Sequence, residues 1–139
     1  MKAITIWQPF ATAIAAGVKK FETRSWETKY RGKIAIHAAA RKITSSQIED
    51  LENIFVIYGV KNPFDDFGGL PLGGVVAVAD LVDCQEITTE FTETLPAMER
   101  ALGDYTAGRY AWQLENIRIL ENPIPAKGQQ GLWNFKVVE

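Results

Sequence analysis

Several stretches of the chain carry the hydrophobic pattern of β-strands. Residues 2–7 alternate in polarity and are rich in Ile and aromatic side chains, which is typical of a half-buried strand. Over residues 32–38, Ile34 and Ile36 share one face, and His37 falls on the opposite face with Lys33 and Ala35. The near-continuous apolar run at residues 75–84 predicts a central strand. Two further strands are predicted over residues 110–120 and 132–138.

Helical periodicity marks other segments of the chain. The predicted helices span residues 10–16, 44–58 and 90–102. Pro9 suits the first turn of the first helix, and Gly17 suits its C-terminal cap. Ser46 and Glu49 predict a capping box at the start of the second helix. Pro96 interrupts the third helix.

The order of these elements predicts the fold class. Strands outnumber helices and do not alternate regularly with them, so we expect a small α+β barrel with a few flanking helices. Residues 62–71 are rich in turn formers and predict a long loop. A chain of 139 residues, 47% of them hydrophobic, can bury one core without disulfides or metal. We therefore expect one domain over residues 1–139.

Charge along the chain is strongly segregated. Between Lys19 and Lys42 there are eight Lys or Arg residues and two acids, a local charge of +6 in a chain of net charge −2. The remainder of the chain therefore carries −8. A concentrated positive segment is typical of a surface that binds a polyanion.

Flat side chains lie among these cations, which favours nucleic acid as the ligand because unstacked bases rest on aromatic rings. Trp26 could equally be packed against the core, and His37 could be a structural histidine. Trp7 and Trp133 are predicted to lie in the core, since Ile6 and Leu132 flank them. The predicted nucleic-acid surface consists of Lys20, Arg24, Trp26, Lys29, Tyr30, Arg31, Lys33 and His37.

Some classes of protein are disfavoured by composition. Cys84 is the only cysteine and His37 the only histidine, so neither a disulfide framework nor a Cys/His zinc site is expected, and no metal or other cofactor is predicted. The first residues lack a signal-peptide layout, and no apolar run has membrane-spanning length. We therefore expect a cytoplasmic protein that does not enter a membrane.

Ordered motifs along nearly the whole chain resemble one domain family. They lie at residues 7–11, 17–26, 30–32, 34–39, 75–84, 123–128 and 131–133. Together they resemble the ASCH (activating signal cointegrator homology) domain, a member of the PUA-like β-barrels. The resemblance implies a barrel with a cleft beside the first helix and a role in RNA binding or nucleoside chemistry.

Some members of this family resemble amidohydrolases that deacylate acetylcytidine with a Lys, a Thr and a Glu. Their motif reads Gly-x-Lys-x-x-Thr-x-Arg, and Gly17, Lys19 and Arg24 match it in this chain. The Thr position holds Glu22 instead, and a carboxylate does not form the same acyl intermediate. The resemblance leaves Asp80, in the predicted central strand, as the candidate acidic partner.

These observations leave three hypotheses for function. The first is a PUA-like module with a basic cleft that binds RNA, a nucleotide or a modified nucleoside. The second is a hydrolase of acylated cytidines or of RNA, in which Lys19 acts with Glu22 or Asp80 in catalysis. In the first hypothesis, Lys19 would instead form a structural ion pair with Glu22 or Asp80 and help to orient the ligand. The third is a module that docks a protein partner.

Overall fold

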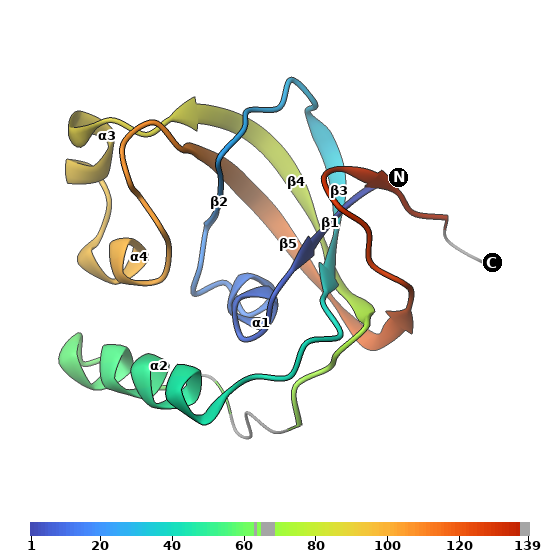
Figure 1. Ribbon diagram of the computed structural model, residues 1–139, viewed down its shortest axis with the longest axis horizontal. Helices are drawn as coiled ribbons and strands as arrows, with labels where there is room; N and C mark the ends of the chain where they lie inside the picture. The colour runs from blue at the N-terminus through green and yellow to red at the C-terminus, as the bar shows by residue number, and fades with distance from the viewer. Residues whose placement is uncertain (63, 65–68, 137–139) are drawn as a thin grey trace.

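The computed structural model describes residues 1–62, 64 and 69–136 (Figure 1). Its elements, in chain order, are β1 (Lys2–Ile6), α1 (Phe10–Ala15), β2 (Phe21–Arg24), β3 (Gly32–Ala38), α2 (Ser45–Ile57), β4 (Gly74–Glu86), α3 (Thr89–Glu93), α4 (Ala97–Ala101), β5 (Tyr110–Pro125) and β6 (Trp133–Asn134). The mixed α+β class is as predicted from the sequence.

The strands form one six-stranded sheet in the order β2-β5-β4-β3-β1-β6. β1 and β3 run parallel, and the other neighbouring pairs are antiparallel. The predicted closed barrel is wrong, because the edge strands β2 and β6 do not pair with each other within the described residues. β6 is only two residues long and bonds the outer side of β1, so it offers no ladder that could complete a barrel.

The sheet curves around α1, which packs into the main core (Figure 1). Ala11 and Ile14 of α1 pack into the main core beside Ile36, Leu81 and Trp112 from the strands. The pairing of β4 with β5 shifts register between Val75/Ala77, Val78/Asp80 and Leu81/Asp83. Such bulges bend a strand and increase its twist. The bulges between β4 and β5 help the open sheet to curve. α1 covers the concave side of the curved sheet.

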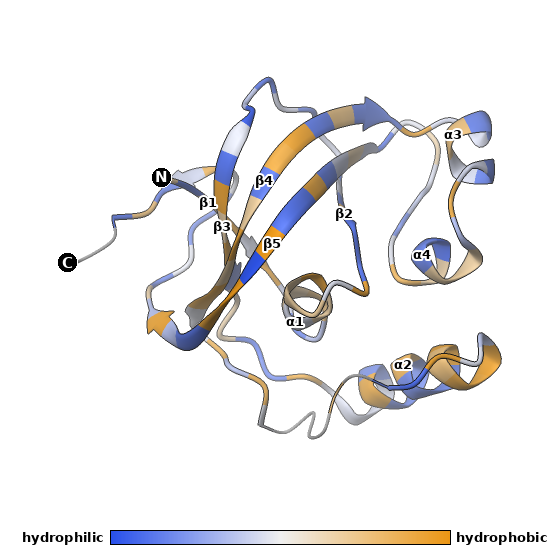
Figure 2. Cartoon of the chain, turned by 180° about the vertical axis from the view of Figure 1, so that it is seen from behind, coloured by the Kyte–Doolittle hydropathy of each residue, from blue (hydrophilic) through white to orange (hydrophobic). Residues whose placement is uncertain are grey.

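Strand alternation predicted the two faces of β3 correctly. Ile34 and Ile36 face the main core, whereas Ala35 joins a second cluster on the other side of the sheet with Trp133 and Phe135. Trp133 is therefore buried, as predicted. Seen from behind, hydrophobic and hydrophilic residues alternate along β4 and β5 (Figure 2). This pattern is typical of antiparallel strands with one solvated face.

The helices follow their local signals, with one correction. α1 ends just before Gly17 as predicted, and the third predicted helix is divided at Pro96 into α3 and α4. The predicted Ser46–Glu49 capping box is wrong. The box is formed by Thr44 and Gln47, whose side chains each accept the other's backbone N–H.

Two sequence predictions extend beyond the described residues. The predicted loop over residues 62–71 includes residues 63 and 65–68, which lie outside the described part of the chain. The strand predicted over residues 132–138 is described as far as residue 136, and only Trp133–Asn134 is assigned to β6.

Candidate functional site

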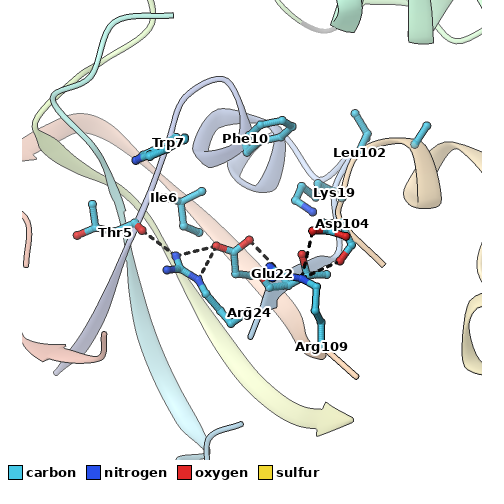
Figure 3. A pocket seen from close by; sticks show the side chains of 13 residues that line it. Thr5, Ile6, Trp7, Phe10, Lys19, Glu22, Arg24, Leu102, Asp104 and Arg109 are labelled. Carbon is cyan, nitrogen blue, oxygen red and sulfur yellow. Dashed lines mark hydrogen bonds and ion pairs between the residues drawn. The ribbon is translucent and has the colours of Figure 1, made fainter. Parts of the chain in front are cut away.

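A cavity of about 620 Å³ lies between the end of β1, the start of α1, β2 and the loop after α4 (Figure 3). Ile6, Phe10 and Leu102 give it apolar walls. Its polar groups come mainly from β2 and from the segment before β5. The lining residues are Thr5, Ile6, Trp7, Phe10, Lys19, Glu22, Thr23, Arg24, Ala101, Leu102, Gly103, Asp104 and Arg109.

The way in which α1 ends brings Lys19 to this cavity. Gly17 has φ +79°, and its N–H donates to the Ile14 carbonyl at 3.0 Å. The N–H groups of Val18 and Lys19 donate to the Ala13 carbonyl at 3.0 and 3.2 Å. These hydrogen bonds around a left-handed glycine form a Schellman motif, which ends the helix and turns the chain back along it. The residue two positions after the glycine therefore points back towards the end of the helix.

The Lys19 ammonium is buried without a partner. The residue is 2% exposed, and Nζ makes no hydrogen bond or ion pair with the described residues. Burial lowers the pKa of this amine, and the Glu22 and Glu99 carboxylates partly oppose that shift. A Cβ atom at Gly103 would lie 3.1 Å from Nζ, so a glycine here keeps the space beside the ammonium open.

Glu22 and Arg24 form a coupled pair beside Lys19. They are two residues apart in β2, so their side chains leave the same face of the strand. Nε and Nη2 of Arg24 donate to Oε2 of Glu22 at 3.1 and 2.8 Å. Nη2 also donates to the Thr5 carbonyl in β1 at 2.7 Å. Because β1 and β2 are not neighbours in the sheet, this guanidinium bridges the gap between them (Figure 3).

Arg109 forms the opposite wall of the cavity. Its guanidinium forms an ion pair with Asp104 at 3.4 Å and donates to the Thr23 carbonyl at 3.3 Å. The hydroxyl and N–H of Thr106 donate to Asp104 and, with Arg109, lower the pKa of that carboxyl. Three cations and two carboxylates thus line a cavity with apolar walls, so its charged groups nearly balance.

Glu99 supports the floor of the site from α4. This residue is buried, and its Oε1 accepts the Lys20 backbone N–H at 2.7 Å. Its Oε2 accepts the Tyr105 hydroxyl at 3.2 Å. Burial, together with the negative charge of Glu99, raises the pKa of Tyr105. No local pattern marks Glu99, because the Lys20 N–H that it accepts lies 79 positions away in the chain.

Lys19 and Glu22, two of the three predicted catalytic residues, meet in the cavity, but Asp80 does not line it. Asp80 lies on β4, where it accepts hydrogen bonds from Asn116 at 3.0 Å and Arg118 at 3.2 Å. The Asn116 hydrogen bond is the largest cause of its lowered pKa. Lys33 faces Asp80 in the ladder between β3 and β4.

Among the predicted nucleic-acid-binding cations, only Arg24 lines the cavity. Lys20, Lys29, Arg31 and Lys33 are exposed and lie outside it. The Arg31 guanidinium is 3.8 Å from the Asp83 carboxylate and donates to two carbonyls of its own loop. The structure therefore does not gather the early cations along this one cavity.

The predicted rings are also dispersed. Trp26 is 37% exposed and packs edge-on against Trp112, with ring centroids 4.8 Å apart. The Tyr30 hydroxyl donates to the Lys33 carbonyl. His37 is buried in the second cluster, where Nε2 bonds the Ala126 carbonyl at 2.7 Å and the ring packs on Trp133. None of these three residues lines the cavity.

Trp7 is the aromatic residue that sequence reasoning misplaced. It was predicted to lie in the core, but it is 55% exposed and lines the cavity. The alternation that buries Ile4 and Ile6 in the main core contains the correct signal, because a residue of the opposite parity leaves that face. Arg109 and Gly103 were also missed, and no local pattern marks either of them.

No three His, Cys, Asp or Glu side chains within the described part of the chain are grouped to hold a metal ion. Across the same residues, no helix has the length and apolar character needed to span a membrane.

Comparison with known proteins gives a consistent result. The family model for the ASCH domain matches residues 4–124. Activating signal cointegrator 1 of Homo sapiens is 26% identical over 135 residues, and that of Mus musculus is 24% identical. Each alignment covers 95% of this chain but 22% of the relative, so the chain spans about a fifth of the length of these curated relatives.

Solved structures share the fold. The crystal structure of ASCH from Zymomonas mobilis superposes with a TM-score of 0.60 at 18% identity, covering 97% of this chain and 87% of that chain. A mutant of the same protein gives a TM-score of 0.57 at 18% identity, covering 97% of this chain and 89% of that chain. At this level of identity, the match establishes the fold alone.

Proposed function

The chain belongs to the ASCH domain family, and from that premise we propose that it binds single-stranded RNA by taking one nucleotide into the cavity at Lys19. The observation that carries the proposal is the Lys19 ammonium, which is buried without a partner inside a cavity. An unsatisfied buried donor of this kind costs about 1–3 kcal/mol or more. A ligand that supplies an oxygen acceptor would remove that cost.

The size and lining of the cavity suit one unstacked nucleotide. A volume of about 620 Å³ lies within the range of small-molecule sites and is too small for a duplex. Ile6, Phe10 and Leu102 offer apolar surface to the faces of a base. Lys19 and Glu22 offer a donor and an acceptor to its polar edge. Base-specific proteins commonly read single-stranded RNA in this way, with an apolar contact on the ring and hydrogen bonds at the edge.

Arg24 and Arg109 suit the phosphate or ribose of the same nucleotide. The Arg24 guanidinium is held by one carboxylate and one backbone carbonyl, and the Arg109 guanidinium by one carboxylate and two backbone carbonyls, so both are positioned before a ligand arrives. The Nη1 group of each arginine makes no hydrogen bond with the described residues and so keeps donors for an anionic oxygen. A preorganised guanidinium fork matches phosphate geometry.

The test compares neighbouring lysines. We would measure the anisotropy of 5′-labelled RNA hexamers of each base, with a hairpin duplex for comparison. We expect Lys19→Met to weaken the tightest hexamer by about tenfold or more, because a charged hydrogen bond is lost. Lys20→Met is the matched control, since Lys20 is exposed and outside the cavity, and we expect an effect within about twofold. Equal effects of the two substitutions would contradict the proposal.

One observation favours a second candidate function, the hydrolysis of an acylated cytidine. Burial lowers the pKa of Lys19, which increases the fraction of neutral amine that can accept a proton from water. Glu22 lies beside it, whereas Asp80 is not part of the same cavity. Acetate release from an acetylated cytidine that disappears in Lys19→Met would favour this reaction. Binding without release would exclude it.

A further inference from the structure

Trp7 is an exposed aromatic side chain on a fixed backbone. Ile6, which precedes it, is in the main core, and Gln8, which follows it, is buried. The Gln8 side chain donates to the Thr12 hydroxyl at 2.7 Å and to the Pro71 carbonyl at 2.9 Å, and accepts the Thr12 N–H at 2.9 Å. Both neighbours of Trp7 are therefore anchored, although its ring is 55% exposed.

A cation covers part of this ring. The Arg41 guanidinium carbon lies 3.8 Å from the Trp7 ring centroid, a stacked cation–π contact. Arg24, Arg31, Arg109 and Arg118 each form an ion pair with a carboxylate. Within the described residues, Arg41 forms none. Its charge is therefore available to a ligand next to the cavity.

Trp7 lies at the edge of the cavity that contains Lys19. Trp7 lines the cavity and is also exposed beyond it, so the ring stands at the mouth. A nucleotide bound at Lys19 in an RNA strand has a neighbour at about this point, because consecutive nucleotides are covalently joined. Aromatic rings with an adjacent cation are a common platform for single-stranded bases.

We propose that Trp7 and Arg41 form a second base site, in which the nucleotide next to the one in the cavity stacks on the Trp7 ring and its phosphate contacts Arg41. This inference rests on the proposed function and extends it. The ligand would be a single strand of at least two nucleotides rather than a free nucleotide. Arg41 can remain stacked on the ring, because its guanidinium donors lie at its edges.

The experiment measures how affinity grows with strand length. We would compare the dissociation constants of the 5′-mononucleotide, the dinucleotide and the hexamer of the preferred base by calorimetry and competition. For the unaltered protein, we expect the dinucleotide to bind about tenfold tighter than the mononucleotide, as is typical for one added base stack. In Trp7→Ala, that gain should fall to about twofold or less, and Trp7→Phe should retain most of it.

Two further variants separate the possible failures. Tyr58→Ala, which removes an exposed ring at the end of α2, should leave the gain unchanged. Lys19→Met should weaken the mononucleotide and the dinucleotide together. A tenfold gain that persists in Trp7→Ala would overturn the second base site and leave the proposed function standing. If no nucleotide or hexamer binds the unaltered protein, both proposals fail.

Discussion

At the scale of single residues, Lys19 lowers the stability of the free protein while it provides a group for binding a ligand. Its ammonium is buried, has no partner and has a lowered pKa, so the charged form is costly in the free protein. The Glu22 and Glu99 carboxylates offset only part of that cost. Groups that a ligand must satisfy are commonly destabilising in the free state.

This balance predicts that the apolar variant is the more stable protein. Lys19→Met keeps the length of the side chain and removes the charge, and we expect the free energy of unfolding at pH 7 to rise by about 1 kcal/mol. Urea unfolding measures this change, with Lys20→Met as the exposed control. A large loss of stability in Lys19→Met would show that the ammonium has a structural partner.

The same lowered pKa fixes the sign of the pH dependence. Between the folded-state pKa of Lys19 and its ordinary value of 10.5, the unfolded chain binds more protons, so stability rises with pH there. The pKa of Tyr105 is raised above its ordinary 10.0, so its contribution falls above that pH. We expect the unaltered protein to gain stability towards pH 10 and then lose it, whereas Lys19→Met should show only the loss.

At the scale of residues, proximity could be predicted from the sequence where a short pattern decides it, and the roles of these residues stay predictions. Lys19, Glu22 and Arg24 lie within six positions, so strand alternation and a helix cap bring them together. Glu99 and Arg109 reach the same region only through tertiary packing of α4 and β5. No local pattern could identify them.

At the scale of elements, the Arg24 guanidinium takes the place of strand pairing between β1 and β2. It connects the Thr5 carbonyl of β1 with Glu22 of β2, two strands that are not neighbours in the sheet. Its removal leaves the Thr5 carbonyl and Oε2 of the largely buried Glu22 carboxylate without the Arg24 donors, whereas Oε1 still accepts the Thr23 N–H. Among the strands of the described residues, only β5 would then bond to the edge strand β2.

We therefore expect Arg24→Gln to lower the free energy of unfolding by about 2 kcal/mol. Arg31→Gln is the matched control, because its ion pair with Asp83 is longer and exposed, and its loss should cost at most about 0.5 kcal/mol. Chemical unfolding measures both values, and hydrogen exchange of the β2 amides locates the change. Comparable losses in the two variants would refute the bridging role.

Elements were predictable in proportion to how local their signals are. Gly17 and Pro96 ended or divided helices where the sequence indicated. The short β6 was predicted to be longer, since its length depends on pairing with β1 rather than on its own residues. The capping box is formed by Thr44 and Gln47 rather than by Ser46 and Glu49, because several consecutive polar residues could each begin the helix.

At the scale of the whole molecule, the segregated charge of the sequence is distributed in space. Arg24 points to the cavity, Arg31 pairs with Asp83, and Lys33 faces Asp80 across the sheet. The acids next to Arg31 and Lys33 come from β4, far along the chain, whereas Arg24 pairs with Glu22 of its own strand. The local charge therefore indicated the segment that contributes to the cavity. The cations of that segment do not line one continuous basic groove in the described residues.

The open sheet has a similar explanation. Strand count and alternation predicted the α+β class, because those properties are local. Whether the edges close depends on how α1 packs and how long β6 is, which only the folded chain decides. The cavity lies between β1 and β2, which are not neighbours in the sheet, so the candidate site coincides with the openness that the sequence did not predict.

The most direct test of the central claim is a crystal structure of the protein with its preferred RNA hexamer. We predict one base within the cavity against Phe10, with a ligand oxygen about 3 Å from Nζ of Lys19. A hexamer bound along Lys29, Arg31 and Lys33, with the cavity empty, would contradict the account.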